Sequence, residues 1–144
     1  MAEQILTELK IPADADYIPV AKRVASSLGS KLGFSLEELD ELCIALTQAC
    51  DSAIEASEDA WGEGGTLKLT YGATGKGIEV EVEAQAPQSR ALTSHRQAHK
   101  LRIEELEVRR LAQEMIRLFV DDFRSQVDAP HGMVRFRMVK YLLG

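Results

Sequence analysis

A long amphipathic helix, predicted for residues 35–57, constrains the fold of this chain more than any other feature. The Ser35 hydroxyl can accept a hydrogen bond from the third backbone amide while Glu38 reaches back to the Ser35 amide, which makes a capping box. Apolar or small residues then recur at spacings of three and four and form a stripe that must face a core: Leu39, Leu42, Cys43, Leu46, Cys50, Ala53, Ile54 and Ser57. Four residues lie close together on the opposite side and form a polar edge where we expect any site to be: Glu41, Gln48, Ser52 and Glu55.

Length and composition favour one ordinary domain over residues 1–144, with 45% hydrophobic and 28% charged residues. The net charge of -6 argues against a general nucleic-acid binder and favours a partner with a basic face. The chain has no apolar run of about 18 residues and no basic start followed by an apolar segment. We therefore expect a cytosolic protein that binds neither nucleic acid nor a membrane.

Cysteine and histidine spacing predicts neither a disulfide nor a metal site. Cys43 and Cys50 are about 10 Å apart along one helix, too far for a disulfide, and we interpret both as small core residues. His95 and His99 could share one face of a helix, but no Cys, Asp or Glu nearby supplies a third ligand at a usable spacing.

The first third of the chain predicts a strand and a helix before the long helix. Residues 5–11 alternate with the period of a strand. Asp14 or Asp16 can cap a following helix, with Pro19 in its first turn and Gly33 at its end. Lys22 and Arg23 point outward from it, either as a solvated face or as a contact for a partner. Its expected buried stripe consists of Tyr17, Ala21, Val24, Ala25, Leu28 and Leu32.

The remaining chain predicts a hairpin, a loop, a helix and a closing hairpin. Residues 66–71 and 77–83 alternate as two strands. Their connection GATGKG resembles a phosphate loop in composition, but a strand follows it instead of a helix, so we interpret it as a turn. Trp61, in the preceding loop, is expected to cover a core edge. Residues 84–100 are predicted to form a loop or a poorly packed helix, and a helix is predicted for residues 106–120. A strand around residues 123–127 and a final strand from Val134 that ends in YLL are joined by the turn APHG. The expected buried stripe of this helix consists of Val108, Leu111, Met115, Leu118 and Phe119.

This order of elements predicts the fold class. Helices grouped in sequence and strands joined by short turns favour an α+β, two-layer sandwich with the helices on one face of a mixed or antiparallel sheet.

Five segments resemble the anti-sigma-factor serine kinases of the GHKL ATPase/kinase superfamily: LKIPADADYIPVAKRV, GFSLEELDELCIALTQACDSAIEAS, GIEVEVEAQA, LAQEMIRLFVDDFRS and GMVRFRMVKYL. The resemblance implies the histidine-kinase-like (Bergerat-type) ATPase fold. It also implies two kinds of partner: a sigma factor, held away from RNA polymerase, and an anti-sigma antagonist, which active members phosphorylate on a serine. Lys22 and Arg23 occupy the region through which such proteins are thought to hold both partners. A homodimer is also implied as a possibility.

The positions that carry chemistry in the active members differ here. The glutamate that activates the serine hydroxyl corresponds to Gln48, whose amide cannot take up a proton near neutral pH. The asparagine that holds magnesium corresponds to Ser52, a poorer metal ligand. The adenine-binding aspartate and the glycine after it correspond to Ala84 and Ala86, and neither offers a side-chain acceptor.

The glycine-rich run that wraps the phosphates is also changed. Arg109 and Arg110 stand where glycines are expected, and their bulk removes the close backbone approach that glycine permits. From the resemblance we therefore expect a partner-switching regulator with no catalytic residue, no bound ATP and no metal.

Two alternatives remain. One is an active serine kinase that uses ATP and Mg²⁺, in which Glu41 or Glu55 replaces the base and Arg109 or Arg110 replaces the glycines. The other is a regulator on the same scaffold that binds a target other than a sigma factor.

Overall fold

A computed structural model describes residues 3–87, 103–128 and 133–142 of the chain. In sequence order its elements are β1 (Gln4–Pro12), a 3₁₀ turn (Ala15–Tyr17), α1 (Ile18–Leu32), α2 (Leu36–Trp61), β2 (Thr66–Ala73), β3 (Gly77–Gln85), α3 (Ile103–Phe119), β4 (Asp122–Asp128) and β5 (Met133–Tyr141). Three features considered in the sequence lie outside the described residues: His95 and His99, the turn APHG, and most of the segment 84–100.

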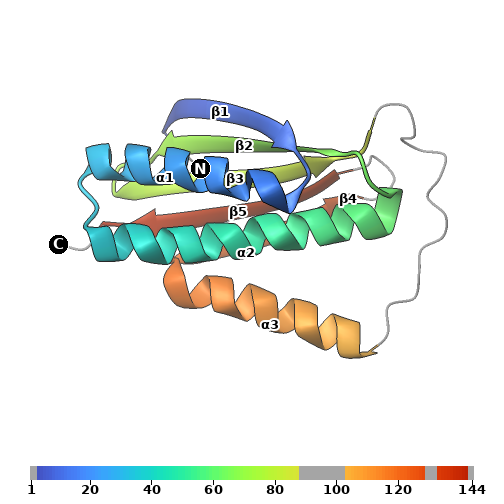
Figure 1. The fold of residues 1–144 in the computed structure, drawn as a ribbon. Coiled ribbons are helices and arrows are strands. Elements are labelled where there is room, and N and C mark those ends of the chain that lie inside the picture. Colours follow the sequence, from blue (N-terminus) through green and yellow to red (C-terminus); the bar gives the residue numbers. More distant parts are fainter. Residues whose placement is uncertain (1–2, 88–102, 129–132, 143–144) are drawn as a thin grey trace.

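The five strands form one sheet in the order β1-β2-β3-β5-β4, and every neighbouring pair is antiparallel. Helices α1 and α2 lie across one face of this sheet, and α3 lies beside α2 on the side away from α1 (Figure 1). The predicted α+β architecture with helices on one face is confirmed, and of the two sheet types left open the antiparallel one is present.

The core lies between this helical layer and the inner face of the sheet. Strand alternation supplies the sheet side of the core, because every second residue of β3 and β5 is buried there: Ile78, Val80, Val82, Ala84, Val134, Phe136 and Met138. The Tyr71 hydroxyl crosses the layers and donates a hydrogen bond of 2.9 Å to the Ala21 carbonyl oxygen. Burial raises the pKa of this phenol well above its ordinary value.

Helix α1 begins at Ile18, one residue after Tyr17, the first residue of its predicted buried stripe. Asp14 caps the short 3₁₀ turn, and Gly33 ends α1 with a left-handed φ of 102°, as predicted. The prediction that Tyr17 belongs to the buried stripe is wrong, because its side chain is 42% exposed. Tyr17 lies in the 3₁₀ turn, whose tighter winding changes the direction of its residues, and Ile18 is buried instead.

Helix α2 has the predicted capping box and the predicted buried stripe except for Cys43, which is only half-buried and lines a groove instead of the core. The Ser35 hydroxyl accepts from the Glu38 amide at 3.1 Å, and the Glu38 carboxylate accepts from the Ser35 amide at 2.8 Å. The helix continues to Trp61, so the placement of Trp61 in a loop is wrong. Its indole is 4% exposed, and its expected position at the edge of the core is confirmed.

Helix α3 buries a different face from the one that the sequence predicts. Leu111 and Leu118, expected in the core, are 61% and 77% exposed, and Met115 between them is also exposed. Ile116 and Val120 are buried instead. Phe119, also expected in the core, does pack against it, and the side chain of Val108 lies outside the described ones. Among the described side chains of this helix, only the face with Ile116 and Phe119 packs against the core. Periodicity therefore placed three residues of the expected stripe wrongly: Leu111, Met115 and Leu118.

Candidate functional site

The polar edge of α2 is accessible, as predicted, but its four residues have different surroundings. Gln48 and Ser52 are partly exposed, and Glu55, in the last third of the helix, is exposed. Glu41 is engaged in an ion pair with Lys140. The edge is therefore a row of groups with separate roles, in which Gln48 and Ser52 occupy the central turns.

A groove of about 900 Å³ runs between α1 and α2 and reaches Gln48. It is lined by Pro19, Lys22, Arg23 and Ser26 from α1 and by Asp40, Cys43, Ile44, Thr47 and Gln48 from α2. Lys22 and Arg23 therefore share one hollow with Gln48, although 25 positions separate Arg23 from Gln48 in the sequence. The cations, Asp40 and the exposed Ile44 side chain make this groove amphipathic, which is typical of a surface that binds another protein.

The two helices that form the groove are in contact through side chains that line it. Ser26 Oγ and Cys43 Sγ are 3.2 Å apart, and the Cys43 thiol also donates to the Lys22 carbonyl oxygen at 3.8 Å. Both cysteines are free thiols. Burial, with a smaller effect of the Asp51 carboxylate, raises the pKa of Cys50 to about 12, so this thiol stays protonated and serves as a packing residue.

Glu41 and Lys140 form a bridge between α2 and the sheet. Lys140 Nζ lies 3.0 Å from Glu41 Oε1 and donates a second bond of 2.8 Å to the carbonyl oxygen of Phe119, the last residue of α3. The sequence reasoning missed Lys140. Strand alternation does contain the signal, because Lys140 follows Val134, Phe136 and Met138 on the buried face of β5 and must find an anionic partner there.

The remaining motif positions lie on β3, directly after its end, and on α3. Ala84 is fully buried in the core and Ala86 packs at its edge. Arg109 and Arg110 lie within the helix α3 instead of in a loop before it, and Arg110 is exposed. A helical backbone directs its amides along the helix axis, so this segment does not present amides to a phosphate from the side.

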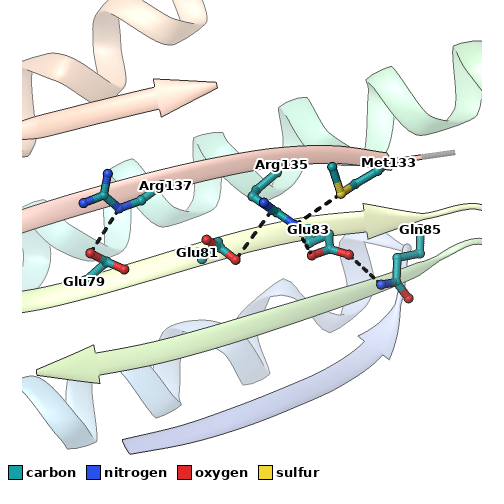
Figure 2. Close-up of polar contacts among 7 residues, drawn as sticks. All are labelled: Glu79, Glu81, Glu83, Gln85, Met133, Arg135 and Arg137. Atoms are coloured by element: carbon teal, nitrogen blue, oxygen red, sulfur yellow. Dashed lines mark hydrogen bonds and ion pairs between the residues drawn. The ribbon is translucent and has the colours of Figure 1, made fainter. Parts of the chain in front are cut away.

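The opposite face of the sheet carries paired charges. The three glutamates of β3 alternate with its buried residues and face the arginines of β5 (Figure 2). Glu79 lies 3.1 Å from Arg137, and Arg135 lies 3.6 Å from Glu81 and 3.3 Å from Glu83. This face is a cross-strand charge ladder whose opposite charges compensate one another.

No group of three or more His, Cys, Asp or Glu side chains in residues 3–87, 103–128 and 133–142 lies close enough to hold a metal ion. Over the same ranges, no helix is both long and apolar enough to span a bilayer.

Comparison with known proteins finds similarity to serine-protein kinases named RsbW. No protein-family model matches the chain. It is 26% identical over 145 residues to the serine-protein kinase RsbW of Bacillus subtilis strain 168, which covers 95% of this chain and 86% of that protein. To the serine-protein kinase RsbW of Bacillus licheniformis it is 24% identical over 141 residues, or 94% of this chain and 84% of that protein.

A third RsbW sequence, from Bacillus licheniformis strain ATCC 14580, matches at 28% identity over 78 residues. That alignment covers 54% of this chain and about half, 48%, of the relative. The two longer alignments extend over the helices and the strands alike, so the resemblance drawn from the sequence segments is confirmed over nearly the whole chain.

Proposed function

Starting from the relationship of this chain to the RsbW-type kinases of the anti-sigma and GHKL group, we propose that it is a partner-switching regulator. It binds a sigma factor, an anti-sigma antagonist or both through the groove between α1 and α2. It does so without binding ATP and without transferring phosphate. The observation that carries the proposal is that the motif positions are exchanged while the core around them is intact.

The surroundings of the motif positions support the loss of chemistry. Gln48 offers an amide where a general base would need a carboxylate, and Ser52 offers only a hydroxyl. The methyl group of Ala84 is enclosed in the core, so no side chain at this position accepts a hydrogen bond from a purine.

The groove supports the binding of a protein. Lys22 and Arg23 provide positive charge on a chain whose net charge is -6, and Ile44 provides an exposed apolar side chain in the same groove. A segment that carries carboxylates beside an apolar side chain is complementary to this lining.

The second candidate function is an active kinase with substituted groups. Glu41 is a weak replacement for the base, because its carboxylate is held by the Lys140 ammonium at 3.0 Å. Glu55 is exposed and two turns beyond Gln48 along α2. Glu55 is therefore the carboxylate to substitute first if phosphate transfer is observed.

A paired assay tests the proposal. The purified protein is titrated with ATP and Mg²⁺ in a calorimeter and is also incubated with labelled ATP and candidate sigma factors and antagonists, with an active family kinase as the positive control. We expect a stable complex with at least one partner, no heat of nucleotide binding and no label on the partner. Label on a partner serine would establish the kinase instead, and its loss in Glu55→Gln would identify the base. A complex with a different signalling protein alone would replace the sigma factor as the target.

A further inference from the structure

A small basic pocket lies over β3, β5 and β4, on the face of the sheet opposite α1 and α2. Its volume is about 340 Å³, and the described residues that line it are Glu81, Arg124, Ser125, Gln126, Arg135 and Arg137. Three cations and one anion give this lining a formal charge of +2, on a chain whose net charge is -6. The basic pocket shares none of these residues with the groove between α1 and α2.

The charge compensation seen between β3 and β5 does not extend from β5 to β4. Arg124 lies directly opposite Arg137 in the antiparallel register, so two guanidinium groups are cross-strand neighbours. Like charges at directly opposite positions repel each other and destabilise the pairing of strands. Between β3 and β5, in contrast, the arginines lie beside glutamates (Figure 2). An external anion in the basic pocket would relieve the repulsion between Arg124 and Arg137.

The neighbouring carboxylates use only part of the hydrogen-bonding capacity of these arginines. Asp122 lies 3.7 Å from Arg124 Nε, and Glu81 lies 3.6 Å from Arg135 Nε. Both distances are longer than a hydrogen bond, and Arg135 Nε has no hydrogen-bond partner within the described residues. A closer contact, of 3.3 Å, joins Arg135 to Glu83 through one terminal nitrogen. A guanidinium has five N–H donors, so donors remain for a ligand in the basic pocket.

We propose that the basic pocket binds a small anion that carries two or more negative charges, either a phosphorylated small molecule or a polycarboxylate. Its volume fits such a ligand, because sites for small molecules begin at about 300 Å³. A guanidinium presents two parallel N–H groups to a carboxylate or to a phosphate, so both kinds of ligand share this recognition. The inference is independent of the proposed function, because it uses neither the groove between α1 and α2 nor the motif positions.

Two residues of the lining have opposite effects on such a ligand. The side chain of Arg124 is 73% exposed, compared with 25% for Arg137, so Arg124 is the cation that a ligand reaches most easily. Its exposure also means that the fold depends little on it. Glu81 is the one anion among the described residues of the lining, and its charge opposes the binding of an anion.

Titration of the full chain with pyrophosphate, and separately with citrate, tests the site. Nuclear magnetic resonance follows the backbone amides, and sodium chloride keeps the ionic strength constant. We expect saturable shifts at residues 124–126 and 135–137, with a dissociation constant of about 1 mM because solvent screens exposed charges. Binding of both probes supports the shared recognition. Binding of pyrophosphate alone would assign the site to phosphorylated ligands, and binding of citrate alone to polycarboxylates.

Two substitutions should change the affinity in opposite directions. Arg124→Gln removes the most exposed cation of the lining and should raise the dissociation constant about fivefold or more. Glu81→Gln removes the opposing carboxylate and should lower this constant about twofold or more. Lys76→Gln is the matched control, because it removes one positive charge from the exposed turn between β2 and β3, outside the basic pocket. This control should leave the dissociation constant unchanged.

Three results would overturn the proposal. The first is the absence of saturable shifts with both probes up to about 10 mM. The second is a set of shifts centred on α1 and α2 instead of β4 and β5. The third is an equal loss of affinity in Arg124→Gln and Lys76→Gln, which would mean that net charge and not the basic pocket determines binding. Circular dichroism shows that each variant is folded.

Discussion

Lys140 on β5 reaches Glu41 on α2 at 3.0 Å and so connects residues that are 99 positions apart in the chain. The lysine is 7% exposed and also donates to the last carbonyl of α3, so one side chain joins the sheet to two helices. A buried ammonium needs an anionic partner and further acceptors, and both are present here. This contact fixes the position of α2, which carries the polar edge, relative to α3.

We expect the two partners of this ion pair to respond differently to substitution. Glu41→Leu leaves the buried Lys140 charge with only the Phe119 carbonyl, and should lower the free energy of unfolding by about 2–3 kcal/mol. Lys140→Met leaves Glu41, which water can reach, and should cost about 1–2 kcal/mol. Glu41→Gln keeps an acceptor and should cost least. Urea unfolding followed by circular dichroism measures the free energy of unfolding of each variant and so gives this order. Equally small losses of stability in all three variants would show that the ion pair contributes little.

Helix α3 provides a second comparison, between its two apolar faces. Ile116→Ala should lower the free energy of unfolding by about 2–4 kcal/mol, because Ile116 is fully buried. Leu118→Gln should change it by less than about 0.5 kcal/mol, because most of this side chain is in water. Chemical denaturation of both variants separates the two faces. A large cost for Leu118→Gln would mean that the outer face is covered in solution.

These residues also show how far the sequence could predict the fold. Capping chemistry and periodicity identified α2, α1 and the strands, because each of these elements has one apolar face and end residues with a specific role. Helix α3 has two apolar faces, and the choice between them depends on packing against α2, which no local pattern encodes. The prediction that Tyr17 is buried was wrong for a related reason, because the short 3₁₀ turn before α1 interrupts the helical period.

The sequence could predict which residues belong to the candidate site, but not that they lie around one groove. Lys22 and Arg23 were selected for their outward direction, and Gln48 for its place on α2. Their meeting around one groove depends on how α1 packs on α2, through contacts such as that of Ser26 with Cys43. The roles of these residues stay predictions until partner binding is measured.

The C-terminal end of α2 should make stability depend on pH. Partial burial raises the pKa of Glu58, and the carboxylates of Glu63, Asp59, Asp14 and Glu55 raise it further. The folded protein then binds this proton more tightly than the unfolded chain, so stability falls as the pH rises from the ordinary value of 4.5 through the raised pKa.

Removing this carboxylate should therefore stabilise the protein. We expect Glu58→Gln to raise the free energy of unfolding at pH 7 by about 0.3 kcal/mol, a small value because solvent and salt screen an exposed cluster. The gain should disappear below pH 4.5. Glu37→Gln, the same change in the first turn of α2, should have the opposite sign because a carboxylate is favourable at a helix N-terminus. Thermal unfolding between pH 4 and pH 8 measures both, and a gain that grows on acidification would contradict the assignment.

Charge reversal in the groove between α1 and α2 tests the partner surface itself. Lys22→Glu combined with Arg23→Glu should weaken the complex with a sigma factor or an antagonist about tenfold or more, because two cations that face an acidic segment become anions. Lys76→Glu combined with Arg124→Glu makes the same total change of charge at two exposed positions outside the groove and should leave the affinity nearly unchanged. Affinities come from surface plasmon resonance at two salt concentrations, with circular dichroism to show that both double variants are folded. The contribution of Lys22 and Arg23 should shrink at high salt, since screening weakens contacts between exposed charges. An equal loss of affinity in both double variants would mean that net charge, and not this groove, determines binding.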